Sequence, residues 1–265
     1  GGVLADGAAA VANGMGVQQT SLAQANRLRF LAPLLVELGW KGLPLLRALL
    51  RSELMRRWAT HPYKQVREEC GVVLALAMEA ASPPPPAHGA LGAALAAEVD
   101  DLVAHLLAAC RVTDPAQPAA AGLSAIEMLE PSDEEEREAA RAARECVLAA
   151  LNHCLLAGRA SACVAQLPAL LPPVLSAAAT LVQPDLANSA KTCAVLLAQA
   201  PLSAALVGAL LQRLHALVTS PSWHLRGSLL LPLQLLIYRG QFIEPPAEHA
   251  AAARKLLQRL LSDGQ

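Results

Sequence analysis

Apolar residues recur every three or four positions along most of this chain, which is the spacing of an amphipathic α-helix. In the segment 43–59, for example, leucines stand at positions 45, 46, 49, 50 and 54. Glycine, proline and small polar residues interrupt the pattern at intervals and mark helix ends. The pattern predicts helices at residues 21–38, 43–59, 63–80, 91–110, 133–156, 161–182 (with proline kinks), 185–199, 202–219, 222–238 and 246–261.

Two segments depart from this pattern. Residues 1–20 are rich in glycine and alanine and are predicted to be disordered, while residues 111–136 combine prolines with an acidic cluster and are predicted to form an inserted loop. Ser132 is expected to cap the following helix, with Glu135 at the capping-box position. Acidic side chains stabilise a helix N-terminus, so we interpret the cluster as a helix start and not as a metal or acid–base site. Ser203 and Ser222 are expected to cap later helices.

The helices are expected to stack as repeats. Alanine and leucine dominate and aromatic residues make up only 3% of the chain, so little material for sheets is present. An apolar residue and a basic residue stand together at 66–67, 143–144, 190–191 and 225–226, with spacings compatible with HEAT units of about 40–47 residues. Helix pairs cover their apolar faces only by stacking on neighbours. The sequence therefore predicts an all-α, HEAT/armadillo-like α-α superhelix (solenoid) over residues 21–265, whose last helix lacks the second member of its pair.

Charge and motifs exclude several function classes. The formal net charge is −1, and no basic stretch interleaved with aromatics points to nucleic acid. Two uncharged stretches, 160–184 and 192–212, contain prolines and lack aromatic ends, so buried helices explain them better than membrane spans. The six cysteines form no C-x-x-C and are interpreted as buried, reduced thiols of an intracellular protein. No phosphate-binding loop or nucleophile motif occurs, so we expect neither catalysis nor a cofactor or metal.

The most distinctive cluster places Trp223 beside His224 and near Arg226. One interpretation is a contact with a ligand or a partner protein. The other, which we favour from the sequence, is a packed turn in which Trp223 closes a helix pair and Arg226 bonds to the preceding loop.

Two segments resemble a known family. His61–Gly71 reads H-P-Y-K-Q-V-R-E-E-C-G and Ser220–Arg226 reads S-P-S-W-H-L-R, each opening an apolar helix. Both are similar to the late HEAT repeats of the proteasome activator complex subunit 4 family, the large single-chain activators of the proteasome core, which show Y-K-x-V-R-E…G and S-S-W-H-x-R at corresponding places. The resemblance spans roughly Leu28 to the C-terminus.

The resemblance implies a dome-shaped solenoid that caps the proteasome core and alters its peptidase activity, in nucleus and cytoplasm. It also implies a link to DNA repair and to acetylated histones, through a bromodomain-like region in these repeats. The candidate binding residues are therefore Trp223, His224, Arg226, Tyr238 and Arg239.

Two departures from the family accompany the resemblance. Arg239 stands where the family has an asparagine, and its charge and reach differ from those of an amide. The family's aromatic C-terminal tail does not occur, so we expect a piece of a longer chain that does not open a proteasome gate by itself. A general HEAT-repeat adaptor, or a transport or assembly scaffold, is the alternative function.

Overall fold

The computed structural model describes residues 21–82, 89–110, 133–200, 202–220, 222–242 and 247–262. These residues form α-helices, short 3-10 helices and turns, and within them no strand occurs, which confirms the all-α prediction. The predictions of disorder at residues 1–20 and of a loop at residues 111–132 lie outside the described residues. The chain divides into two compact units, Gly1–Cys110 with Pro131–Cys163 (unit 1) and Arg111–Glu130 with Val164–Gln265 (unit 2).

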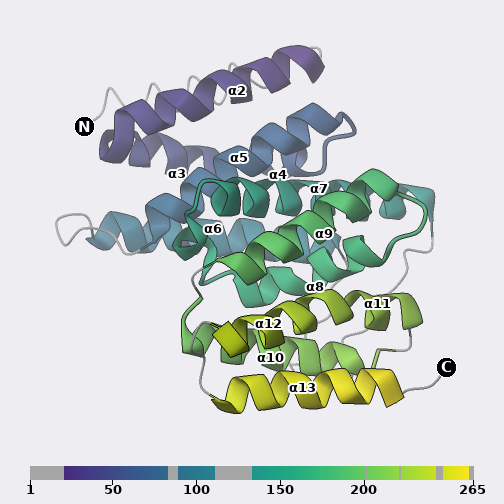
Figure 1. Cartoon of the computed structure of the whole chain (residues 1–265). Helices are drawn as coiled ribbons and strands as arrows, with labels where there is room; N and C mark the ends of the chain where they lie inside the picture. Colours follow the sequence, from purple (N-terminus) through teal and green to yellow (C-terminus); the bar gives the residue numbers. More distant parts are fainter. Residues whose placement is uncertain are drawn as a thin grey trace, which may run out of the picture. The chain divides into compact units, whose positions relative to one another are not determined.

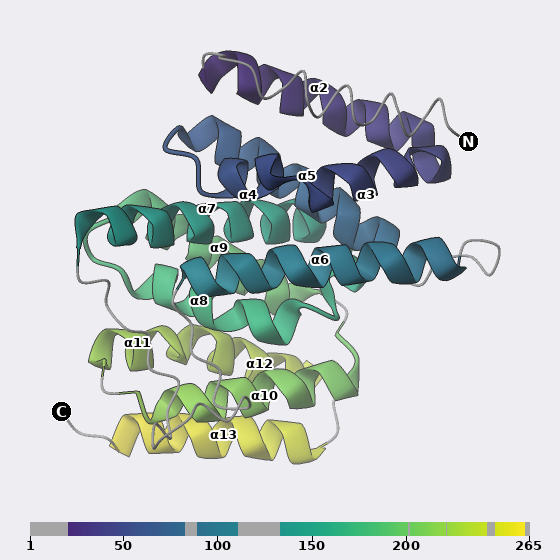
Figure 2. The same ribbon diagram turned by 180° about the vertical axis from the view of Figure 1, so that it is seen from behind.

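Unit 1 is built around the contact between helices α5 and α7, the most extensive helix pair in the described chain. Helix α5 is buried on several sides, because α2 and α7 lie on opposite sides of it while α4 and α6 also contact it (Figures 1 and 2). The elements of unit 1 are α2 (Ser21–Leu38), η1 (Gly39–Gly42), α3 (Leu43–Arg51), α4 (Glu53–Ala59), α5 (Lys64–Ala81), α6 (Gly89–Ala109), α7 (Glu134–Leu156) and η3 (Ala160–Cys163).

A glycine allows α5 and α7 to approach closely. A Cβ added to Gly71 would lie 2.6 Å from the Cβ of Ala149 and 2.7 Å from the carbonyl oxygen of Cys146, closer than real contacts allow. Around this point the small buried side chains of Cys70 and Ala150 complete the interface. The glycine of the H-P-Y-K-Q-V-R-E-E-C-G segment is therefore required by packing.

Unit 2 contains two layers of helices followed by a single helix. Helix α8 contacts α9, and α10, α11 and α12 pack against this pair, while α13 lies against α10 and α12 on the side away from α8 and α9 (Figures 1 and 2). The last helix thus has neighbours within its own unit, which the sequence pattern did not predict. The elements are α8 (Leu167–Ala179), α9 (Pro184–Gln199), α10 (Ala204–Val218), α11 (Trp223–Ser228), α12 (Leu230–Phe242) and α13 (Ala247–Ser262).

Three predicted helices are interrupted. The helix predicted at 43–59 divides at Ser52, whose backbone is extended and whose hydroxyl donates to the carbonyl of Leu49 at 2.6 Å. The helix predicted at 222–238 divides at Leu229, because Pro232 has no N–H to donate to the carbonyl four residues earlier. The helix predicted at 161–182 becomes η3, a turn and α8, with Pro168 in the first turn of α8.

The start of α7 also differs from its prediction. Asp133, and not Ser132, is the N-cap, since its carboxylate accepts from the backbone N–H of Glu136 at 2.7 Å. Residues 134–136 of the predicted loop therefore belong to the first turn of the helix. The predicted caps Ser203 and Ser222 are confirmed, because their hydroxyls accept from the N–H groups of Leu206 and Leu225.

Candidate interaction surface

The turn before α5 is held by a buried arginine. The guanidinium of Arg67 donates to the carbonyl oxygens of His61 at 2.5 Å and Pro62 at 2.7 Å, and its Nε donates to Glu145 of α7 at 2.8 Å. The Arg67 side chain is 1% exposed and that of Glu145 is 9% exposed. This arginine therefore joins the turn to α7 by charge-assisted bonds in a largely desolvated site.

Two neighbouring, partly exposed groups extend this network. Arg141, one turn before Glu145, donates to the same carboxylate at 3.1 Å. His61 accepts from the backbone N–H of Tyr63 through Nδ1 at 3.0 Å. Burial, reinforced by the charge of Arg67, lowers the pKa of the His61 imidazole. His61 is thus favoured as a neutral acceptor.

The turn before α11 repeats this framework. Nη1 of Arg226 donates to the carbonyl oxygen of Ser220 at 2.6 Å, and the hydroxyl of Ser220 accepts from the N–H of Ser222 at 3.3 Å. In both turns the arginine bonds to a carbonyl six residues before it, and the residue preceding the arginine, Val66 or Leu225, is buried. The predicted bond from Arg226 to the preceding loop is confirmed.

The side chains that the two turns present to solvent differ. Trp223 is 65% exposed, and its ring lies against that of His224, with centroids 3.5 Å apart and planes tilted by 33°. The corresponding positions of the first turn carry the exposed polar residues Lys64 and Gln65. The expectation that Trp223 closes the helix pair is therefore wrong. Its indole is an exposed aromatic surface of the kind that anchors protein interfaces.

The other two candidate residues lie elsewhere. Tyr238 is 64% exposed and belongs to α12, whereas Trp223 is the first residue of the separate helix α11. Arg239 follows it in α12, and its side chain lies outside the described part of the structure. The structure thus gathers Trp223, His224 and Arg226 at one turn and places Tyr238 apart from them.

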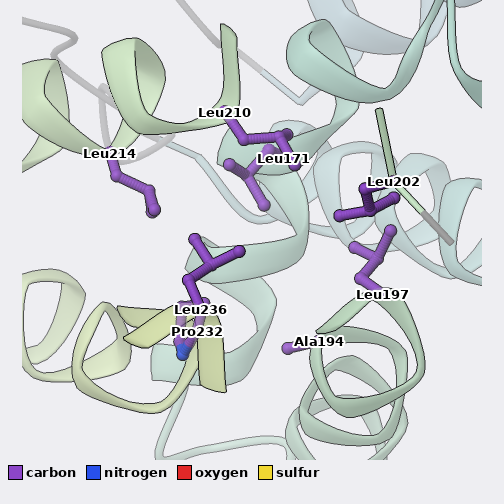
Figure 3. A pocket seen from close by; sticks show the side chains of 8 residues that line it. All are labelled: Leu171, Ala194, Leu197, Leu202, Leu210, Leu214, Pro232 and Leu236. Atoms are coloured by element: carbon purple, nitrogen blue, oxygen red, sulfur yellow. The ribbon is translucent and has the colours of Figure 1, made fainter. Parts of the chain in front are cut away.

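An apolar cavity of about 30 Å³ occurs in unit 2 (Figure 3). A void of this kind offers a substrate no polar group for orientation, so it is a packing gap and not a binding site of the usual type. It is lined only by Leu, Ala and Pro side chains from α8, α9, α10, α12 and the segment before α10: Leu171, Ala194, Leu197, Leu202, Leu210, Leu214, Pro232 and Leu236.

Within the described ranges, no three His, Cys, Asp or Glu side chains are grouped closely enough to hold a metal ion. Among the helices that the structure describes, none combines the length and apolar character needed to cross a bilayer.

Sequence reasoning missed Glu145 and the role of Gly71. Glu145 pairs with an arginine 78 positions away, and no local pattern predicts such a partner. A weak signal was available, since Glu145 follows Arg144 in one of the paired apolar–basic positions.

Comparison with protein-family models, with curated proteins and with solved structures finds no match to this chain.

Proposed function

We propose that this chain forms a HEAT-like α-α superhelix (solenoid) that acts as a non-catalytic regulator of the proteasome, as part of an activator that caps the core particle and modulates its peptidase activity. The observation that carries the proposal is the shared geometry of the two family-like turns. Arg67 and Arg226 each donate to the carbonyl six residues earlier, next to a buried aliphatic residue. Residues that carry the resemblance therefore have matching structural roles.

The packing of the helices supports a repeat scaffold. Helix α5 is covered on opposite sides by α2 and α7, and α10 and α12 lie between the α8–α9 pair and α13. Such layers bury apolar faces that no single helix pair could cover alone. A solenoid of this kind supplies broad surfaces for protein partners.

The polar groups support a non-catalytic role. Arg67 and Glu145 form the most deeply buried ion pair among the described residues. Arg67 also donates to backbone carbonyls, and the partly exposed Arg141 pairs with both Glu145 and Glu138. A nucleophile or general base requires a reactive group presented to substrate. This network instead fixes a turn to its neighbouring helix.

Two partners follow from the resemblance. The first is the proteasome core particle, and the second is acetylated histones, with the protein acting in nucleus and cytoplasm. Trp223 and Tyr238 are both largely exposed, and exposed aromatic side chains favour contacts of this kind. At position 239 an arginine would donate to an acetyl carbonyl with a full charge, so we expect the histone contact to be weaker than one made by asparagine.

Affinity purification of the tagged endogenous protein, followed by mass spectrometry, tests this proposal. We expect α and β subunits of the core particle in near-stoichiometric amount. Recovery of other partners without core subunits would reject the proteasome role and leave a HEAT adaptor. A parallel purification with Trp223→Ala shows whether the exposed indole takes part in any partner contact.

A further inference from the structure

Helix α13 presents a basic face to solvent. Arg254, Lys255 and Arg259 are all exposed, and within the part of the chain that the structure describes none of the three forms an ion pair. The helix has one acidic residue, Glu248, in its first turn. No carboxylate of the described residues therefore neutralises these three charges.

The arginines of unit 1 are arranged differently, because most of them pair with a carboxylate even where they are exposed. Arg51, with a side chain 63% exposed, lies 3.6 Å from Glu98, and Arg159, 51% exposed, pairs with Glu79. The unpaired basic residues of α13 thus depart from the usual arrangement in this chain. The paired arginines of unit 1 are Arg29, Arg47, Arg51, Arg56, Arg67, Arg137, Arg141 and Arg159.

The position of α13 within unit 2 directs the basic residues outward. The helix packs against α10 and α12 on one side (Figures 1 and 2). Its buried apolar residues stand three positions apart, as expected for one face of a helix. These residues are Ala250, Ala253 and Leu256.

The charges on the opposite side of α13 lie close together. Lys255 and Arg259 are four residues apart, so their Cβ atoms are about 6 Å apart on one face. Arg254 stands at the edge of this face, seven residues before Leu261, which is 69% exposed. Only Arg259 lies in the last turn, where the helix dipole favours a basic residue. The dipole therefore does not account for Arg254 and Lys255.

The distribution of charge along the chain reinforces this face. Residues 164–265 carry seven Lys or Arg and four Asp or Glu, a formal charge of +3, whereas residues 1–163 carry 14 and 18, a formal charge of −4. The overall charge of −1 thus conceals a basic second part. A positive field around α13 attracts negatively charged partners.

We propose that Arg254, Lys255, Arg259 and Leu261 of α13 form a docking surface for an acidic segment of a partner protein. In an extended peptide, side chains two residues apart point to the same side and lie about 6.5 Å apart. This spacing matches that of Lys255 and Arg259, so alternate carboxylates can pair with both. The exposed Leu261 adds an apolar contact beside Arg254. This surface is independent of the proposed proteasome role.

Two other anionic partners are less favoured by the structure. An amphipathic helix binds a membrane through its apolar face, and that face of α13 is buried within unit 2. Proteins that bind nucleic acid combine many phosphate contacts with aromatic side chains for stacking. Helix α13 offers three basic residues and no Phe, Tyr or Trp.

The test measures fluorescence anisotropy of a labelled dodecapeptide of alternating glutamate and serine, with one leucine near its end, added to the 265-residue chain at low ionic strength. We expect binding that weakens as salt is added, because the contacts are exposed charge pairs. A matched peptide with glutamine in place of glutamate should not bind. Equal binding of the two peptides, or no binding of the glutamate peptide, would overturn the proposal.

Two triple variants distinguish this surface from a general effect of charge. Arg254→Ala, Lys255→Ala and Arg259→Ala together should weaken binding by about tenfold, as expected for the loss of three exposed charge pairs. The control removes the same charge from exposed, ion-paired arginines of unit 1. It should change affinity by less than about twofold. Equal losses would show that binding follows net charge and would overturn the proposal. The control substitutions are Arg51→Ala, Arg137→Ala and Arg159→Ala.

A DNA duplex serves as the competing anionic probe. We expect it to bind more weakly than the glutamate peptide at the same ionic strength. If the duplex binds more tightly and the α13 triple variant abolishes that binding, the surface recognises nucleic acid and the assignment to an acidic protein segment is wrong. Circular dichroism checks that both triple variants keep the helical content of the parent, as expected for exposed positions.

Discussion

The turns before α5 and α11 share a framework and differ in what surrounds it. In the first turn, Arg67 is buried and ion-paired with Glu145, and the side chains exposed to solvent are those of Lys64 and Gln65. In the second turn, Arg226 is partly buried, and the exposed Trp223 ring lies against the ring of His224. The two turns share their arginines because each arginine bonds to the carbonyl groups of its turn. Any functional difference between the turns must therefore come from the side chains that differ.

The largest expected effect is a difference in stability between variants of the two arginines, Arg67 and Arg226. Arg67→Ala should lower the free energy of unfolding by about 3–5 kcal/mol, because it leaves Glu145 buried with its charge only partly compensated. Arg226→Ala should cost about 1–2 kcal/mol, through the lost bond to Ser220. Urea unfolding followed by circular dichroism measures both. Arg67→Met combined with Glu145→Leu should recover much of the loss, and equal losses in the two single variants would remove the distinction between the turns.

The glycines that follow the two arginines give the next effect. Gly71→Ala should destabilise the chain by about 1–3 kcal/mol, because its Cβ overlaps α7. Gly227→Ala meets open space and should be neutral or stabilising by up to about 1 kcal/mol. Thermal unfolding of the two variants provides the comparison. A Gly71→Ala protein as stable as the parent would contradict the close approach of α5 and α7.

Helix caps in the two units should differ less. Asp133→Ala removes the acceptor of a 2.7 Å bond and should cost about 1 kcal/mol, whereas Ser222→Ala removes a 3.4 Å bond and should cost about 0.5 kcal/mol. Both are measured by urea unfolding. If Ser132→Ala rather than Asp133→Ala destabilised the chain, the assignment of the cap would be wrong.

Exposure distinguishes two tryptophans. Trp223→Ala should change stability by no more than about 0.5 kcal/mol, because the indole is 65% exposed. Trp58, at 2% exposed, is the matched control, and Trp58→Ala should cost about 3–5 kcal/mol. A large loss of stability in Trp223→Ala would show that Trp223 packs within the fold and is not a free surface residue for partner contacts.

The smallest effect is a pH dependence confined to the first turn. The lowered pKa of His61 means that the folded state disfavours its imidazolium. His61 therefore contributes stability that is present above its ordinary pKa of 6.5 and is lost as the pH falls below that value. Urea unfolding between pH 7.5 and 5, compared with His61→Gln, isolates this contribution. Identical pH profiles for the two proteins would show that His61 does not contribute.

The helices were predictable because their apolar spacing extends over many residues. Helix breaks, caps and the candidate site were harder to predict, because each depends on one or two individual interactions. The breaks at Ser52 and Leu229 depend on one hydroxyl–carbonyl bond and on one proline three residues downstream. Ser132 and Asp133 are both good caps, and the sequence alone does not choose between them. At the candidate site, the Arg226 bond followed from local spacing, but the Glu145 partner and the exposure of Trp223 depend on tertiary packing.

Electron cryo-microscopy of the endogenous protein isolated together with its partners tests the central claim most directly. The account predicts density for a continuous superhelix on the end of the proteasome core, in which α5 and α11 occupy equivalent positions of different repeats. A particle without the core, or one in which these helices do not belong to a repeating array, would contradict it.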